Sequence, residues 1–362
     1  MKPKIILGLA LVLSISCSGV PLFGGIIEQR PFNVFGMDLF ESLEHDASVY
    51  NCSIVKRESS LSLSDHNIER GTVQLHVIQT LRGTNRLDVT LPYSFTRTGG
   101  IGLDGSLIWP TLDDVGRSNL LCVVVPDGQD PSAPTIPGIN EAASKVVVID
   151  KDEAAVREME VICKVHDGQI TPELIRQLKN AVASPQPTLR DFALEATIMK
   201  LGKVKPDEAL EIIRSRVATY RELTKHLNVS NDPLDESAFR LYTQNADHAD
   251  AIEADGLFSD ILQGFQRMGP EEKICTFLCR CLVVLAQSES KTIREKAITS
   301  LAIGISFYDY RPDLDFRPLD GLDTSELKAL NAVLDAESRS GDTNLLANIR
   351  LIRDRLVPKT IK

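Results

Sequence analysis

Three glycines, Gly100, Gly102 and Gly105, have the G-x-G-x-x-G spacing that lets backbone amides approach the pyrophosphate of a dinucleotide. That chemistry also needs a helix to begin beside the last glycine, because the helix N-terminus binds the phosphates. Here Trp109 and Pro110 follow, and the proline would break such a helix. We therefore interpret the glycines as part of a loop in a β domain, and we predict no cofactor.

Cysteines gather at a second place, where Cys275, Cys279 and Cys281 lie close together in the sequence. Thiolates are good zinc ligands, but at about 100° per helical residue Cys281 points roughly 200° away from Cys279. One helix cannot direct all three sulfur atoms to one metal. We predict no metal site and expect Cys281 to pack in the apolar core, with a disulfide from Cys275 or Cys279 as the alternative.

Other catalytic patterns are missing from the sequence. The six histidines are scattered, none lies in an H-E-x-x-H zinc motif, and no G-x-S-x-G nucleophile motif occurs. The acidic stretches 247–255 and 309–323 lack the spacing of a calcium-binding loop, so we interpret both as solvated loops. We predict no catalytic residue and expect a protein that is not an enzyme.

Aromatic residues collect around the second acidic stretch, although only 5% of the chain is aromatic. Aromatic and arginine side chains dominate the binding energy of many protein interfaces. We therefore predict a partner-binding ridge formed by Phe307, Tyr308, Tyr310 and Phe316.

The N-terminus has the layout of a secretory signal peptide. Lys2 and Lys4 precede an apolar run over residues 5–15, and small residues follow it. This run is too short to span a bilayer of about 30 Å as a helix. We expect residues 1–18 to be a signal peptide and the chain to be exported.

Residues 13–17, LSISC, resemble the lipobox of bacterial lipoproteins, in which the cysteine is lipidated and becomes the new N-terminus. Ser14 departs from the pattern, since leucine is usual three places before the cysteine. The resemblance implies a lipid anchor at Cys17 in the periplasm or cell envelope, and we expect no other membrane contact. Cleavage after Ser16 or Ser18 without lipidation is the alternative.

Six further cysteines in an exported chain favour disulfides over metal binding. Cys52 and Cys122 both lie in β-like segments of the same half of the chain, so they form the first disulfide candidate. Free buried cysteines are the alternative, because a free thiol behaves as a small apolar side chain.

Length and composition indicate a globular protein of about two domains. The chain has 362 residues, 43% of them hydrophobic, and a net charge of -10. This hydrophobic content excludes a fully disordered chain, and the acidic charge disfavours binding to nucleic acid. At roughly 150 residues per domain, the length allows about two domains.

The first half of the chain has the period-two pattern of β-strands. After a linker over residues 19–46, we expect a small antiparallel β-barrel or sandwich over residues 47–150. Its strands are predicted at 48–55, 72–78, 87–91, 119–125 and 145–149.

This β region resembles a domain of secreted bacterial proteins that is similar to the netrin and metalloproteinase-inhibitor barrel. The resemblance rests on a strand with a V-x-V-x-x-x-x-K-G-like pattern, TVQLHVIQTLRG, followed by VGRSNLLCVVV. Arg82 replaces the usual lysine, and the aromatic residues of the second motif are missing. The resemblance implies an OB-like barrel. The inhibitors' C-x-C device is incomplete at Cys17, so we do not carry over their activity.

The second half, residues 151–362, switches to the helical period, and we predict an all-α domain there. Thr171 and Thr324 are expected to start helices, and Gly202 and Gly269 to end them. The helices are predicted at 153–165, 171–182, 188–202, 206–220, 255–268, 270–287, 292–305, 325–338 and 344–357.

Two of the helical segments, 184–202 and 288–306, are similar to one another at a distance of 104 residues. The identical pairs are Ser184/Ser288, Thr188/Thr292, Arg190/Arg294 and Ala193/Ala297. The pattern resembles the second helix of a HEAT-type repeat, which implies helix pairs stacked into an array. Two generic amphipathic helices with chance identities are the alternative.

The sequence thus predicts an α+β multidomain protein that binds rather than catalyses. We expect an exported, non-catalytic interaction or scaffold protein of the bacterial cell envelope, with an unidentified protein partner on the helical domain. One alternative is an enzyme or enzyme inhibitor with its site in the loop at 99–109. Another is binding of a small ligand in the mouth of the barrel.

Overall fold

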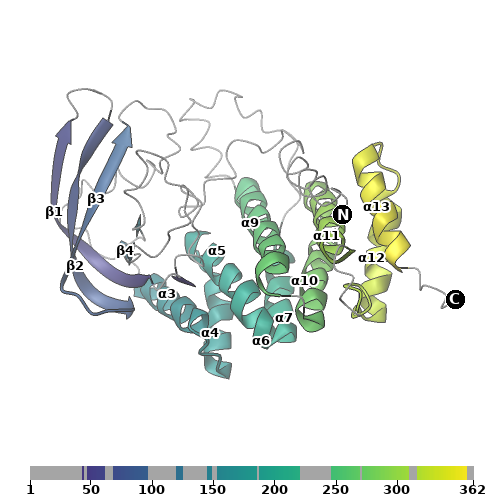
Figure 1. Cartoon of the computed structure of the whole chain (residues 1–362), viewed down its shortest axis with the longest axis horizontal. Coiled ribbons are helices and arrows are strands. Elements are labelled where there is room, and N and C mark those ends of the chain that lie inside the picture. Colours follow the sequence, from purple (N-terminus) through teal and green to yellow (C-terminus); the bar gives the residue numbers. More distant parts are fainter. Residues whose placement is uncertain are drawn as a thin grey trace, which may run out of the picture.

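A computed structural model confirms the α+β class. The strands come first, and the helices extend from them until α13 (Thr343–Leu356) lies at the end of the molecule opposite the sheet (Figure 1). The structure describes residues 43–44, 47–61, 68–96, 120–124, 145–148, 153–185, 187–220, 246–269, 271–309 and 316–356.

The described strands form one antiparallel sheet in the order β3-β2-β1-β4-β5. Ile54 pairs with Leu75 and Cys52 with Val77, and all four side chains are buried on the same side of the sheet. Each predicted strand is present, and the first three run further than expected. Their bounds are β1 (Ser48–Leu61), β2 (Ile68–Arg82), β3 (Asp88–Thr96), β4 (Leu120–Val124) and β5 (Lys145–Val148).

Irregularities in the pairing of β1 with β2 turn two apolar side chains outward. The register shifts between Ile54 and Lys56, and again opposite Asn51, so that Val55 and Ile78 are extra residues without a partner in the ladder. Both side chains are about half exposed. A bulge of this kind bends the strand and increases its local twist.

The helices form two layers, and successive helices alternate between them. Neighbours within each layer pack against one another, as do helices across the layers. Layer A consists of α4 (Pro172–Val182), α7 (Pro206–Val217), α10 (Glu272–Leu285) and α12 (Thr324–Glu337). Layer B consists of α3 (Glu153–His166), α5 (Pro187–Ala196) with its extensions η3 (Thr197–Leu201) and α6 (Gly202–Val204), α9 (Ala246–Arg267), α11 (Lys291–Asp309) and α13.

Local capping explains where two of these helices begin. The Thr171 hydroxyl accepts a hydrogen bond from the Leu174 amide at 3.2 Å, which satisfies a free N–H of the first turn of α4. Asp323 and Glu326 form a reciprocal capping box at the start of α12. The predicted starts near Thr171 and Thr324 are therefore confirmed.

Gly202 was expected to end a helix, and this prediction is wrong. It lies in α6, a helical turn that directly continues η3, and its Cα approaches the ring of Phe277 on α10. A Cβ at this position would lie 2.2 Å from the ring, so the glycine allows the two helices to pack closely. Gly269, by contrast, has a φ of 89° just after α9, as the sequence predicted.

One apolar core runs from the start of β1 through both helical layers. Leu43, Ala47 and Val49 are buried in the same cluster as Met159 and Ile162 of α3. The predicted domain boundary at residue 150 therefore separates segments that share a core.

Candidate functional site

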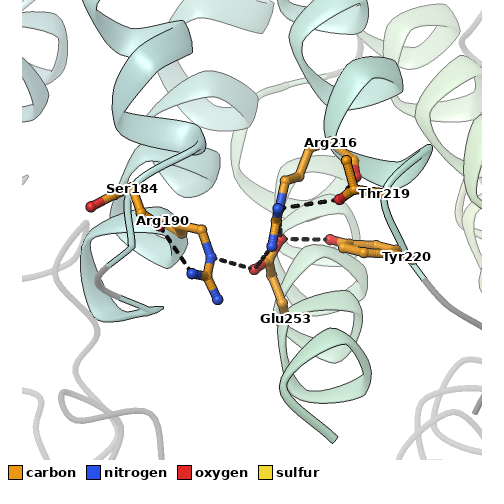
Figure 2. Close-up of polar contacts among 6 residues, drawn as sticks. All are labelled: Ser184, Arg190, Arg216, Thr219, Tyr220 and Glu253. Atoms are coloured by element: carbon orange, nitrogen blue, oxygen red, sulfur yellow. Dashed lines mark hydrogen bonds and ion pairs between the residues drawn. The ribbon is translucent and has the colours of Figure 1, made fainter. Parts of the chain in front are cut away.

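The most elaborate polar cluster of the described residues surrounds Glu253, in the first part of α9 (Figure 2). Its side chain is only 3% exposed. Arg190 of α5 donates to Oε2 through Nε at 2.9 Å. Arg216 of α7 donates to both oxygens, through Nε at 2.5 Å and Nη2 at 2.8 Å. One carboxylate thus joins two layer B helices to a layer A helix.

A phenol completes the cluster. The Tyr220 hydroxyl donates to Oε1 of Glu253 at 3.0 Å, and the Arg216 guanidinium lies 5.7 Å from the centre of the Tyr220 ring. Burial, and then the negative charge of Glu253, raise the pKa of Tyr220, so the hydroxyl remains a donor. Because both carboxylate oxygens accept from these donors, we interpret Glu253 as a fixed joint between helices rather than as a general base.

Arg190 has a second role in the turn between α4 and α5. Its Nη1 donates to the carbonyl oxygen of Ser184 at 3.0 Å, just after α4 ends. Carbonyl groups at the end of a helix lack partners within the helix, so this bond satisfies one acceptor of the turn. A single guanidinium therefore holds the turn and reaches the next layer B helix.

The second copy of the sequence repeat makes similar contacts, although its carboxylate partner lies on a layer A helix, α12. Nη1 of Arg294 donates to the carbonyl oxygen of Ser288 at 3.0 Å, and its Nε donates to Glu337 at 2.9 Å. Ala193 and Ala297 are both fully buried. Two of the identical pairs therefore occupy matching positions: each arginine donates to the carbonyl oxygen of its matched serine.

A third ion pair lies between the two copies. Lys296 of α11 contacts Asp255 of α9, two residues after Glu253. Together these six residues form what we call the layer B ladder: Arg190, Glu253, Asp255, Lys296, Arg294 and Glu337. It connects three layer B helices in order, α5, α9 and α11, and ends at Glu337 on α12 of layer A.

Layer A has a corresponding ladder. Lys179 of α4 pairs with Glu211 of α7 at 3.1 Å. Arg280 of α10 lies between Asp207 of α7, at 2.6 Å, and Glu326 of α12, at 2.7 Å. Each neighbouring pair of helices in this layer is therefore joined by an ion pair.

The partners of the two repeated arginines were missed in the sequence. The stretch 247–255 was interpreted as a solvated loop, and this prediction is wrong, because α9 begins at Ala246 and both Glu253 and Asp255 are largely buried. Its many polar residues hide the helical period. The one available signal was the identity of Arg190 and Arg294, since a partly buried arginine needs an acidic partner.

The structure describes three of the four residues of the predicted aromatic ridge. Tyr308 is buried at the end of α11, with ring centres 5.9 Å from both Phe265 and Phe316. Phe307 and Phe316 are partly buried and pack against the apolar core. The prediction is therefore wrong for Tyr308, whose ring packs against Phe265 of α9, and it stays a prediction for Phe307 and Phe316. Tyr310 lies outside the described residues.

The predicted disulfide between Cys52 and Cys122 is also corrected, since Cys52 is a buried free thiol. The register places Leu120 opposite Cys52, whereas Cys122 lies opposite Tyr50. Residues two positions out of register are roughly 7–8 Å apart, which exceeds the usual Cα separation of a disulfide.

The other described cysteines are free and buried as well. Burial raises the pKa of Cys163 to about 12 and that of Cys275 to about 11, and it raises the pKa values of Cys279 and Cys281. A thiol is nucleophilic only as the thiolate. These thiols therefore stay protonated and are poor nucleophiles at neutral pH. The expected core position of Cys281 is confirmed. The described residues hold no group of three or more ligands placed to bind a metal ion.

Two remaining predictions concern segments outside the described residues: the lipidation candidate Cys17 and the glycine-containing loop at 99–109. Within the described part of the chain, no helix is both long and apolar enough to cross a bilayer. Comparison of the chain with family models, with curated proteins and with solved structures found no match.

Proposed function

We propose that this chain is a non-catalytic scaffold whose helical region, a HEAT-like array, binds a protein partner. The observation that carries the proposal is the repeat of contacts at Arg190 and Arg294, which join neighbouring units of a two-layer stack. Stacked helix pairs present extended surfaces, and proteins of this architecture use them to bind other proteins.

The two ladders support this function because they fix the helices from α4 to α12 against their neighbours. A surface that is already rigid loses little conformational entropy on binding, which favours affinity. The open face of layer A fits this role: Arg176, Lys179 and Glu211 are all at least 48% exposed. We place the partner on this face of α4 and α7.

For the cellular location of the protein, we propose export by the signal peptide and a lipid anchor at Cys17 in the bacterial envelope. The sheet would then belong to an OB-like barrel next to the array. Buried thiols fit such a compartment, because thiols with raised pKa values resist oxidation even where disulfides form. Fractionation of cells that produce the chain tests the anchor: Cys17→Ser should move the protein from the membrane fraction to the soluble fraction.

Site-specific photocrosslinking of the full chain in its native envelope tests the binding surface. A photoreactive residue replaces Arg176, Glu211 or, as a matched exposed control on the sheet, His76. We expect one partner to be captured from both helical positions and not from His76. Capture from His76 alone, or from none of the three, would contradict the proposal.

A further inference from the structure

A second buried polar cluster lies where the sheet meets the helices, and its centre is His166, the last residue of α3. The side chain is 5% exposed. Its Nε2 lies 3.6 Å from Oε1 of Glu44, which belongs to the segment before β1, and its Nδ1 lies 3.7 Å from Oδ1 of Asp167. The imidazole is therefore placed between two carboxylates from the two sides of the junction.

Two cations connect the same carboxylates across the junction. Arg82, at the end of β2, donates to Asp167 at 2.8 Å and to the carbonyl oxygen of Ala47 at 2.6 Å. Lys200, in the π-helical turn η3, donates to Glu44 at 2.6 Å. The two charges of each sign balance one another while the imidazole is neutral.

We propose that this junction is a pH-sensitive latch: protonation of His166 adds a third cation between Arg82 and Lys200 and releases the sheet from the helical array. The inference goes beyond the proposed scaffold function and does not depend on it. The latch is selective for this interface, because the layer A and layer B ladders contain no histidine.

The charges around His166 give the direction of the response. Among the described residues, the charged groups of Glu44, Asp167, Arg82 and Lys200 act on it. Burial, and then Lys200 and Arg82, lower the pKa of His166 to about 4. Burial acts to raise the pKa of Glu44, but Lys200 outweighs it and the pKa lies below the ordinary value.

An exposed histidine has a pKa of about 6.5. Between pH 6.5 and 4, the open junction therefore binds a proton that the closed junction does not, so closure becomes less favourable as the pH falls through this window. Below about pH 4 the closed and the open junction both bind the proton, so the opening equilibrium no longer increases as the pH falls. From these two pKa values the opening equilibrium should rise about 30-fold between pH 7.5 and 5.0.

Hydrogen exchange of the full chain at pH 7.5 and 5.0, corrected for intrinsic exchange rates, measures this opening. We expect the amides of β1 and β2 beside Ala47 and Arg82 to open about 30-fold more often at the lower pH, while those of α10 and α11 change little. His166→Gln should remove the rise. His76→Gln is the matched control, because His76 is exposed beside Asp88 on the same sheet and should leave the rise intact.

An unchanged rise in His166→Gln, or no rise in the unaltered chain, would overturn the latch. If the His166→Gln variant does not fold, NMR of the unaltered chain can measure the pH midpoint at which the His166 imidazole titrates. A midpoint below pH 5 for His166 supports the latch, and a midpoint at or above 6 overturns it.

Discussion

The two copies of the repeated arginine make the same bonds but differ in how completely their carboxylates are enclosed. Glu253 accepts from Arg190, Arg216 and Tyr220, whereas among the described residues Glu337 has an ion pair only with Arg294. Arg190 is 13% exposed and Arg294 is 26% exposed. The comparison teaches that the same type of ion pair can contribute different amounts to the free energy of unfolding. The contribution depends on how far the surrounding side chains exclude water from the pair.

The largest effect is expected from Glu253→Gln. The substitution keeps the shape but removes the charge that two partly buried guanidinium groups need. We expect the free energy of unfolding to fall by about 3 kcal/mol, as measured by urea denaturation of the full chain. A loss no greater than that of a surface substitution would show that Arg190 and Arg216 find other partners.

Glu337→Gln makes the same change in the second copy. Because Arg294 is more exposed and is the only cation on this carboxylate among the described residues, water compensates for part of the loss. We expect a decrease of about 1–2 kcal/mol in the same denaturation experiment. Equal losses for Glu253 and Glu337 would break the comparison between the two copies.

Tyr220→Phe separates the phenol from the guanidinium groups. It removes one hydrogen bond to Glu253 while the ring stays beneath Arg216. We expect a loss of about 1 kcal/mol, since the carboxylate keeps its charged donors. A double-mutant cycle with Glu253→Gln should show that the two losses are not additive.

Lys179→Ala should have the smallest effect. Its ion pair with Glu211 belongs to the layer A ladder, but the two side chains are 48% and 71% exposed. We expect a change within about 0.5 kcal/mol, which increased salt does not enlarge. A loss comparable to that of Glu337→Gln would mean that exposed and buried ion pairs stabilise the array equally.

Much of the fold could be predicted from the sequence, because strands and helices have different periods of apolar residues. The alternation at Val73, Leu75 and Val77 gave β2, and the spacing of Ile274, Phe277 and Cys281 gave α10. The start of α9 could not be predicted, since Asp247, Asp250 and Glu253 give no apolar stripe there.

The polar sites were harder to predict, because their members are distant in sequence. Glu253 is 63 residues after Arg190, and Glu44 is 156 residues before Lys200. Only packing brings such residues together. The error at Tyr308 was avoidable: it follows Leu301 and Ile305 at helical spacing, so the period already indicated a buried position.

The alternation of helices between the layers explains why the repeat spans 104 residues. The hairpin of α4 and α5 and that of α10 and α11 are separated by one further layer A helix, α7, and one further layer B helix, α9. The two similar segments are therefore separated by one helix of each layer in addition to α10. Between the two copies, the carboxylate of Glu253 accepts from Arg216 of α7, a layer A helix, as well as from Arg190 of α5, a layer B helix. The two copies of the repeated arginine therefore lie in the same layer, on α5 and α11, with α9 of that layer between them.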